Sequence, residues 1–331
     1  MLDHYLIWIV VLLAVGFDYI NGFHDTANAI ATSVSTRAIS PRNAIIMAAC
    51  LNFIGALVST GVAKTIGGNL VLSPDLINSG VIAAALFGAI VWNLLTWWIG
   101  IPSSSSHALI GGVIGAVGVS VGFDALNVEG IGKIFISLIA SPIVAMIGGY
   151  IIMHILAAIF GRFSPILLND GFKRMQLVSA ALMAFSHGSN DAQKAMGIIT
   201  LTLVSGGYID TLDVPVWVKL MCATAMALGT AAGGWKIIST MGTKIFKLET
   251  INGFAADLNS ALTIFTATFL HLPVSTTHVV SGSIMGVGSA KRVKAVNWGV
   301  ARSMVMAWFV TIPLSALVSA IVYGVVSFVL G

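Results

Sequence analysis

Long apolar stretches follow one another along almost the whole chain, and short polar or charged segments separate them. Many of these stretches reach the roughly 20 residues that a helix needs to cross the hydrocarbon layer of a membrane. A transmembrane β-barrel would show short segments of alternating polarity instead. The pattern therefore predicts an all-α polytopic membrane protein. In the first half the expected helices span 5–36, 42–66, 78–100, 104–121 and 132–160, and in the second half 175–205, 215–234, 254–271, 275–290 and 297–329.

Polar and charged side chains interrupt two of the apolar stretches. The first cluster reads Asp18-Tyr-Ile-Asn21-Gly22-Phe-His24-Asp25-Thr-Ala-Asn28, and the second reads Ser186-His-Gly188-Ser-Asn190-Asp191-Ala-Gln-Lys194. An acid at the centre of a bilayer costs roughly 2.5–3.5 kcal/mol on insertion scales, so such groups are expected to face a cavity or a ligand. Gly22 and Gly188 mark the places where each helix is expected to break and free backbone groups for binding.

A second pair of motifs indicates that the chain contains an internal duplication. Pro102-Ser-Ser-Ser-Ser-His107 recurs as Pro273-Val-Ser-Thr-Thr-His278. The aspartate of each polar cluster precedes its proline by a similar distance, 77 residues from Asp25 and 82 residues from Asp191. Motifs in the same order at similar spacing predict two repeats. We place them at 1–161 and 162–331, within one transmembrane unit.

The distribution of charge predicts how the helices are oriented. Only 8% of the residues are charged, whereas soluble domains carry about 25%. When the helices are threaded back and forth, one face receives the basic loops with Arg37, Arg42, Arg162, Lys173, Arg174, Lys236, Lys244, Lys247, Lys291, Arg292 and Lys294. The other face receives Asp3, Asp75, Asp124, Glu129, Asp210 and Asp213, with Lys64, Lys133 and Lys219. The positive-inside rule makes the basic face cytoplasmic and puts both termini outside. The net charge of +4 is thus a topology signal and does not indicate nucleic-acid binding.

The same threading makes the two polar helices, 5–36 and 175–205, run in opposite directions. Inverted repeats with broken helices are typical of secondary transporters, whose site lies near the membrane midplane at the repeat interface. The segments 104–121 and 275–290 are short and rich in glycine and hydroxyl side chains. We expect each to form a re-entrant helical hairpin with the helix before it, in which the proline begins the turn and serine or threonine caps the second arm.

The hairpins predict an anion site. A helix N-terminus offers free N–H groups and about half a positive charge, which favours anions, and hydroxyl groups add donors. An oxyanion such as phosphate or sulfate fits such a site. The residues predicted to bind it are Ser104, Ser105, Ser106, Ser275, Thr276 and Thr277, together with Asp25 and Asp191.

The polar clusters predict a cation site beside the anion site. Carboxylate and amide oxygens are hard ligands that suit Na⁺, and the candidates are Asp25, Asn28, Asn21, Asp191, Asn190, Ser105 and Thr276. A cation and an anion that neutralise each other raise each other's affinity, and this coupling is reciprocal. Asn52 and Asp257 are further candidates for coupling, on the helix that follows the motif in each half. Four histidines lie close to the motifs, and they either relay protons, which would make H⁺ the coupling ion, or hold a carbonyl or hydroxyl group in place: His24, His107, His187 and His278.

Other chemistries lack the residues that they need. The histidines have no Cys–His cluster or His-Glu-x-x-His motif beside them that would indicate zinc, and no Gly-x-Ser-x-Gly elbow indicates a hydrolase. Cys50 and Cys222 lie in apolar stretches and imply no disulfide framework. We therefore expect no enzyme and no resident cofactor. An anion-selective channel built from the same helix termini remains an alternative, and it would conduct without ion coupling.

Three segments, Gly22-Phe-His-Asp25-Thr-Ala-Asn28, His187-Gly-Ser-Asn190-Asp191 and Pro273-Val-Ser-Thr-Thr-His278, resemble the signature segments of the inorganic phosphate transporter (PiT) family. The resemblance covers nearly the whole chain, in order and in both halves. It implies symport of inorganic phosphate with Na⁺ or H⁺ across the cell (inner) membrane by an inverted-repeat helical fold. It also implies that Asp25 and Asp191 are the essential acids. The expected partners are phosphate, Na⁺ and the lipid bilayer, with a homodimer left open.

The chain departs from the family pattern at two places. The usual Gly-Ala-Asn-Asp of the first repeat reads Gly22-Phe-His-Asp25 here. A second acidic position, often Glu, reads Asp257 in the second half and Asn52 in the first. The interpretation that we favour is Na⁺-coupled symport of phosphate, with an H⁺-coupled phosphate or sulfate permease and an anion channel as alternatives.

Overall fold

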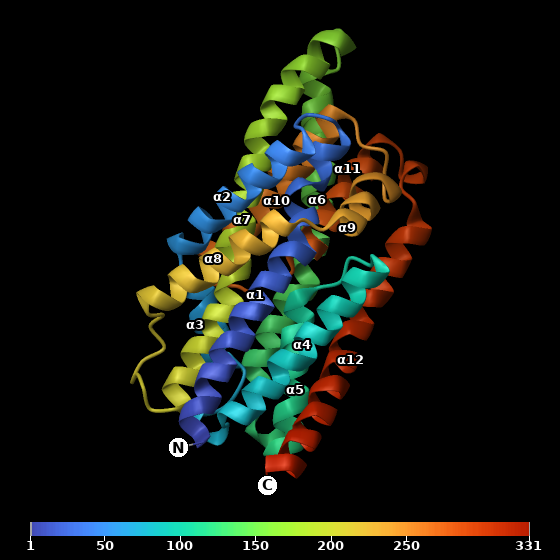
Figure 1. The fold of residues 1–331 in the computed structure, drawn as a ribbon. Coiled ribbons are helices and arrows are strands. Elements are labelled where there is room, and N and C mark those ends of the chain that lie inside the picture. Colours follow the sequence, from blue (N-terminus) through green and yellow to red (C-terminus); the bar gives the residue numbers. More distant parts are fainter. Residues whose placement is uncertain (1, 331) are drawn as a thin grey trace.

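The computed structural model describes residues 2–330, and it describes side chains for residues 6–164, 168–234 and 236–328. Every regular element in residues 2–330 is a helix, and the only β feature there is an isolated bridge between Val71 and Leu126. The helices form an elongated bundle in which α1 begins and α12 ends at the same end (Figure 1). The predicted all-α fold is confirmed.

The two halves contain the same series of elements. The first half consists of α1 (Leu2–Ser35), α2 (Pro41–Val58), α3 (Gly61–Asn69), α4 (Ser79–Ile99), α5 (Ser105–Ser120) and α6 (Val128–Phe160). The second half consists of α7 (Pro165–Ser205), α8 (Val216–Ala232), α9 (Trp235–Ser239) with the π-helical η3 (Thr240–Lys244), α10 (Thr250–Phe269), α11 (Thr276–Lys291) and α12 (Trp298–Leu330). Three short 3₁₀ turns lie in the loops, η1 (Pro74–Leu76), η2 (Phe123–Ala125) and η4 (Val293–Ala295).

Several of these helices are suited to span a membrane. Within the described residues, the five helices α1, α2, α4, α6 and α12 are long and apolar enough to do so. Val216–Ala232 and Lys236–Lys244 make a sixth span if this pair, which bends by 68°, is counted as one. The long α7 is a continuous helix, but the second polar cluster interrupts its apolar stretch. Helix α5 is a shorter apolar helix of 16 residues.

Equivalent helices of the two halves run in opposite directions and exchange partners. Just after α1, Thr36 donates a hydrogen bond of 2.7 Å to Gln176 near the start of α7. At the other end Gly206, just after α7, lies beside Ile7 of α1. Helix α1 packs on α8 while α7 packs on α2, and α5 packs on α12 while α11 packs on α6. This reciprocal arrangement is what inverted repeats predict.

The predicted breaks at Gly22 and Gly188 are wrong, because α1 and α7 are continuous helices through both positions. These glycines serve close packing between helices instead. A Cβ atom at Gly22 would collide with the carbonyl oxygen of Met226 on α8, and one at Gly188 would collide with that of Asn52 on α2. Small residues allow membrane helices to approach in this way, and a continuous helix keeps its backbone hydrogen bonds inside the apolar bundle.

The actual breaks lie in the second helix of each half. The prediction of one helix over 42–66 is wrong, since α2 ends at Val58 and α3 begins at Gly61. Gln193 of α7 accepts the freed N–H of Ala63 at 3.1 Å. In the second half α8 ends before Gly233, whose φ of 74° requires a glycine. The apolar pattern continues across the first break and does not reveal it, whereas the predicted helix 215–234 already ends close to the second.

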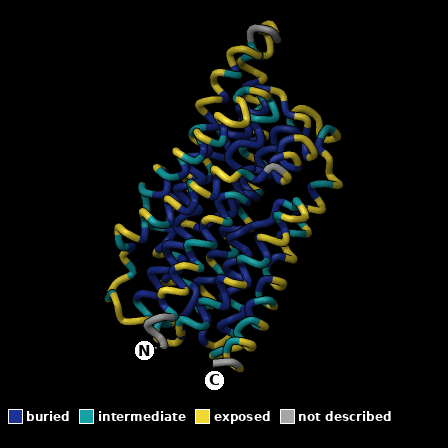
Figure 2. Tube along the Cα trace, in the orientation of Figure 1, coloured by how far each residue is buried: buried dark blue, intermediate teal, exposed yellow. Residues whose placement is uncertain are grey.

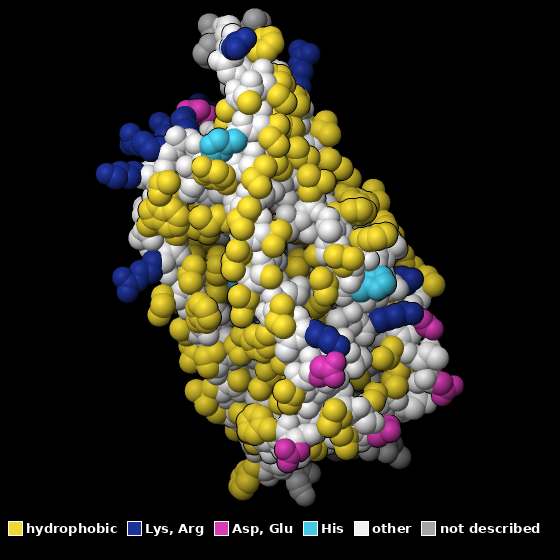
Figure 3. All heavy atoms as spheres, turned by 180° about the vertical axis from the view of Figure 1, so that it is seen from behind, with side chains coloured by type: hydrophobic (Ala, Val, Ile, Leu, Met, Phe, Trp, Pro, Cys, Tyr) yellow, Lys and Arg dark blue, Asp and Glu magenta, His cyan; other side chains and the backbone are white. Residues whose placement is uncertain are grey.

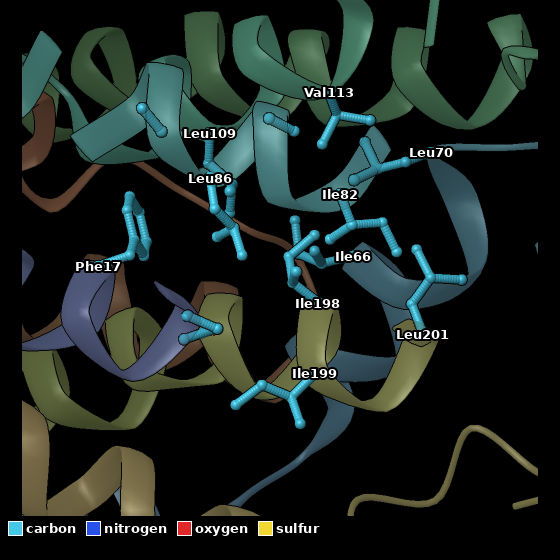
Figure 4. Close-up of a cluster of buried hydrophobic side chains, with 14 of the residues drawn as sticks. Phe17, Ile66, Leu70, Ile82, Leu86, Leu109, Val113, Ile198, Ile199 and Leu201 are labelled. Carbon is cyan, nitrogen blue, oxygen red and sulfur yellow. The ribbon is translucent and has the colours of Figure 1, made fainter. Parts of the chain in front are cut away.

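Residues from both halves form the interior. Figure 2 shows buried residues along the middle of the bundle and exposed residues around it. In the close-up of Figure 4, Phe17 of α1, Leu86 of α4, Leu109 of α5 and Ile198 of α7 belong to one cluster of buried side chains. Lipid tails are as apolar as these side chains, so the cluster contributes van der Waals packing more than removal from water.

Charge separates toward the two ends of the molecule. Figure 3 shows most Lys and Arg side chains toward one end and most Asp and Glu side chains toward the other, which is the end where α1 begins. Lys64 of α3 pairs with Asp213 in the loop between α7 and α8 at 2.5 Å, and the sequence predicts both residues on the acidic face. Lys291 pairs with Glu249 at 2.6 Å. The side chain of Asp3 lies outside the described residues.

We expect Gly22→Ala to destabilise the protein by about 1–3 kcal/mol, because the added methyl group forces α1 away from α8. Gly16→Ala is the matched control on the same helix, since nothing lies within 4 Å of a Cβ atom there. Thermal unfolding of the detergent-purified variants, followed by size-exclusion chromatography, measures both. Equal melting temperatures for the two variants would contradict the packing role of Gly22.

Candidate functional site

Both hairpins begin their second arm with a serine cap, as the sequence predicts. The Ser104 side chain accepts the N–H of His107 at 3.2 Å at the start of α5. The Ser275 side chain accepts the N–H of His278 at 3.3 Å at the start of α11. Each capping hydroxyl thus satisfies its own helix, and the free N–H groups of the first turn remain at the helix ends.

The two helix N-termini meet in the middle of the bundle. Ser106 of α5 donates a hydrogen bond of 3.2 Å to the carbonyl oxygen of Val274, which precedes α11. The rings of His107 and His278 lie 4.6 Å apart. Two partial positive charges of helix dipoles therefore point at one region, and this region is where the predicted anion site requires them.

Each hairpin presents a hydroxyl group to the aspartate of its own half. Ser105 donates to Oδ2 of Asp25 at 3.1 Å, and Thr276 donates to Oδ2 of Asp191 at 3.0 Å. One longer contact crosses between the halves, from Thr277 to Oδ1 of Asp25 at 3.4 Å. The structure thus brings together the predicted residues from α1, α5, α7 and α11 around the two carboxylates.

The three asparagines of the predicted cation site differ in position. Asn28 donates to Thr276 and Thr277 at 3.2 and 3.0 Å, and its Oδ1 has no hydrogen-bond partner within the described part of the chain. Asn21 accepts a hydrogen bond from Ser105 at 2.6 Å. Asn190 instead donates to Thr268 at 2.9 Å and to the carbonyl oxygen of Leu272, and so it holds the hairpin turn.

Basic groups lie directly against both aspartates. His24 Nδ1 is 2.6 Å from Asp25 Oδ1, and the ammonium of Lys194 is 2.5 Å from Asp191 Oδ1. Asp25, His187 and Asp191 each offer one ligand atom, and these atoms lie within 4.8 Å of one another. At an effective dielectric constant of 20, two carboxylates at that distance repel by roughly 3 kcal/mol. The Lys194 ammonium compensates one of these two negative charges.

Sequence reasoning did not assign a role to Lys194, and it considered His24 only as one of the four motif histidines that either relay protons or hold a polar group in place. Lys194 follows Asp191 by three residues, which places both side chains on one face of a helix. That spacing is the signal that predicts their contact. His24 is adjacent to Asp25, and its other ring nitrogen, Nε2, reaches the hydroxyl of Thr96 at 3.2 Å.

The prediction that Asn52 and Asp257 hold matching positions is wrong. Asn52 lies on α2, whose counterpart is α8, whereas Asp257 lies on α10, whose counterpart is α4. Asn52 lies 3.1 Å from the His187 ring and donates to Thr230 at 2.9 Å. Asp257 accepts a hydrogen bond from Thr32, one helical turn after Asn28, and so it lies outside the central cluster.

His107 and His278 also border a second region. Both line a hollow of about 490 Å³ between α6 and α12, whose other lining residues are almost all apolar. His278 stacks on Trp308 with ring centroids 3.8 Å apart. The two histidines therefore separate this apolar hollow from the hairpin tips that carry Ser106 and Thr277.

A model of the phosphate transporter family matches residues 21–319 of the chain. This chain belongs to the phosphate transporter family. A relative from Bacillus subtilis (strain 168), a "Probable low-affinity inorganic phosphate transporter", is 54% identical over 97% of both chains. A relative of the same description from Rhizobium meliloti (strain 1021) is 46% identical over 95% of this chain and 94% of its own.

A solved structure described as "The sodium-dependent phosphate transporter" has the same fold, with a TM-score of 0.89 and 26% sequence identity. The similarity covers 98% of this chain and 99% of that chain. These findings confirm the family resemblance and the helical membrane fold. The protein is a phosphate transporter and not an enzyme.

The transporter holds its central site closed. None of the predicted site residues that the structure describes is more than 5% exposed. This set comprises Asn21, Asp25, Asn28, Asn52, Ser104, Ser105, Ser106, His107, Asn190, Asp191, Asp257, Ser275, Thr276, Thr277 and His278. A buried site needs a movement of helices before phosphate enters or leaves.

We expect Thr276→Ala to reduce phosphate uptake by roughly ten- to hundredfold, since a hydrogen bond to a charged group contributes about 1.5–3 kcal/mol. Thr276→Ser keeps the hydroxyl group at Asp191 and should restore most of the uptake. Initial rates of labelled phosphate uptake into proteoliposomes, at equal amounts of folded protein, compare the three forms. If the alanine and serine variants were equally impaired, the methyl group of Thr276 would matter and its hydroxyl group would not.

Proposed function

We propose that this transporter is a symporter that moves inorganic phosphate together with Na⁺. The observation that carries the proposal is the meeting of two capped helix N-termini with the buried carboxylates of Asp25 and Asp191. Helix termini and hydroxyl groups attract an oxyanion, whereas the carboxylates repel it. A cation bound between them removes the repulsion.

The charges at the centre explain why transport is coupled. Asp25 and Asp191 contribute two negative charges, and Lys194 contributes one positive charge. With the imidazoles neutral, this set is net negative and opposes phosphate. A cation makes phosphate binding more favourable, and phosphate in turn strengthens cation binding by the same free energy. A site that binds neither ligand well alone carries both across together.

Oxygen ligands favour Na⁺ as the coupling ion. The Asp25 carboxylate and the unpartnered Oδ1 of Asn28 lie at the tips of the hairpins, and hard oxygen donors suit Na⁺. The solved structure with the same fold is described as sodium-dependent. The contact between His24 and Asp25, at 2.6 Å, favours H⁺ as the second candidate, because an imidazole beside a carboxylate is a common proton carrier.

We further propose an orientation in the cell membrane. The end rich in Lys and Arg faces the cytoplasm and both termini lie outside, which follows from the positive-inside rule and the charge separation in Figure 3. The membrane potential then acts on any net charge that moves, at about 2.3 kcal/mol per charge per 100 mV. Assembly as a homodimer stays a prediction.

Labelled phosphate uptake into proteoliposomes tests the function directly, with an inward Na⁺ gradient, an inward H⁺ gradient or neither. We expect Na⁺ to drive accumulation above equilibrium, and Asp25→Asn and Asp191→Asn to abolish it. Asp213→Asn is the matched control, because it makes the same chemical change at an exposed acid.

Other outcomes would change the proposal in different ways. Accumulation driven only by H⁺ would replace Na⁺ as the coupling ion and favour a role for His24. Uptake that merely equilibrates under every gradient would indicate a channel. Sulfate uptake that exceeds phosphate uptake under the same gradient would contradict phosphate as the preferred substrate.

The orientation makes a separate prediction for two exposed residues, Asp210 in the loop after α7 and Lys244 at the end of η3. In a Cys50→Ala background, a membrane-impermeant maleimide added to intact cells should label Asp210→Cys and leave Lys244→Cys unlabelled until the cells are opened. Both positions are exposed, and Cys222 is buried. The reverse labelling pattern would show that the termini face the cytoplasm.

A further inference from the structure

The two halves of the central site differ at one position. When Asp25 is matched with Asp191, Asn28 is matched with Lys194, because each residue follows its aspartate by three. A neutral amide thus stands in the first half where an ammonium group stands in the second. The surrounding hydroxyl contacts are nearly the same, since Ser105 binds Asp25 as Thr276 binds Asp191.

Lys194 forms a buried ion pair with Asp191. Among the side chains that the structure describes, Lys194 is the only buried lysine or arginine, with 1% of its area exposed. Its Nζ donates to Oδ1 of Asp191 at 2.5 Å. Oδ2 of the same carboxylate accepts the hydroxyl of Thr276 at 3.0 Å and lies 3.5 Å from the ring of His187. Both oxygens of Asp191 therefore have protein partners, as do both oxygens of Asp25, but only Asp191 has a lysine ammonium among its partners.

Asp25 has a different environment. Its partners are the hydroxyl groups of Ser105 and Thr277 and the ring of His24. The ring's other nitrogen faces hydroxyl groups, with which a neutral imidazole can bond. No lysine or arginine among the described residues pairs with Asp25. Asn28 donates to Thr276 and Thr277 of the second hairpin, and its buried Oδ1 has no hydrogen-bond partner within the described part of the chain.

We propose that the Lys194 ammonium is a built-in counter-cation for Asp191, so that the mobile coupling cation binds at Asp25 alone and one cation accompanies each phosphate. The inference rests on cation-coupled symport and adds the number of cation sites and the residue that sets it. An ammonium group tethered one helical turn from the carboxylate needs no ion from solution. Its positive charge also excludes a second cation from Asp191, because like charges repel strongly at low dielectric.

The charge count connects this residue to stoichiometry. With Lys194 present, Asp25 and Asp191 leave one negative charge, which one monovalent cation neutralises. Without the lysine the same two carboxylates leave two negative charges, and two cations are needed. Replacing Lys194 by the residue that its counterpart carries should therefore create a second Na⁺ site.

The test measures ²²Na⁺ and ³²P-phosphate uptake together in proteoliposomes. We expect wild-type protein to show a Hill coefficient for Na⁺ of about one, and Lys194→Asn to approach two, since a Hill coefficient rises at most to the number of sites. The Na⁺ carried per phosphate should double in the variant. Asp191→Asn alone leaves the buried Lys194 ammonium without its partner, whereas Asp191→Asn combined with Lys194→Asn removes both charges and should support uptake with a Hill coefficient of about one. A lysine with a merely structural role would leave the Hill coefficient unchanged in Lys194→Asn.

If Lys194→Asn does not fold, two other measurements still test the inference: uptake by the opposite variant, Asn28→Lys, and the number of Na⁺ carried per phosphate by the wild type. Asn28→Lys places a second tethered cation beside Asp25, and phosphate uptake should lose its dependence on Na⁺. Retained Na⁺ dependence in Asn28→Lys, or two or more Na⁺ per phosphate in the wild type, would overturn the inference.

The same experiment separates this inference from Na⁺ symport itself. If H⁺ alone drives the wild type, Na⁺ symport fails as a proposal. The number of mobile cations is then measured as the number of H⁺ carried with each phosphate. One H⁺ per phosphate supports a single mobile-cation site, and two H⁺ per phosphate overturn it.

Discussion

Two buried carboxylates face two helix N-termini in the middle of this transporter, and the rest of the structure serves to hold them there. Carboxylates in an apolar bundle are stable only with partners. Asp25 and Asp191 obtain them from the first hydroxyl residue of α5 and of α11. The capping serines keep those residues at the helix ends. Helix dipoles and carboxylates thus place an anion-attracting and a cation-attracting environment side by side.

Glycine packing makes this arrangement possible without broken helices. Gly22 and Gly188 bring α1 against α8 and α7 against α2, so the polar clusters lie on continuous helices with their backbone bonds intact. The interruptions fall one helix later in each half, where Gln193 satisfies a freed backbone group. The halves exchange partners throughout, and the site consequently draws on residues from both ends of the chain.

The closed centre and its charge balance are the physical basis of the proposed cation coupling. A phosphate ion is repelled by a centre with net negative charge, and a cation is not stable in a buried site without a counter-charge. Lys194 makes the two halves chemically unequal in a fold that is otherwise nearly symmetric. Unequal halves give the site a defined charge requirement, which a strictly repeated pair of aspartates would double.

Local features of the sequence were enough to predict the all-α membrane fold, the duplication, the serine caps and the two aspartates. Hydropathy, repeated motifs and capping chemistry depend only on neighbouring residues. The tertiary structure alone decided what depends on the helix lying opposite. It made Gly22 and Gly188 packing contacts, placed the break after Val58, separated Asn52 from Asp257, and brought the hydroxyl of Thr276 to Asp191. A sequence pattern states that a residue is small, polar or charged, but its partner across the bundle determines what that property does.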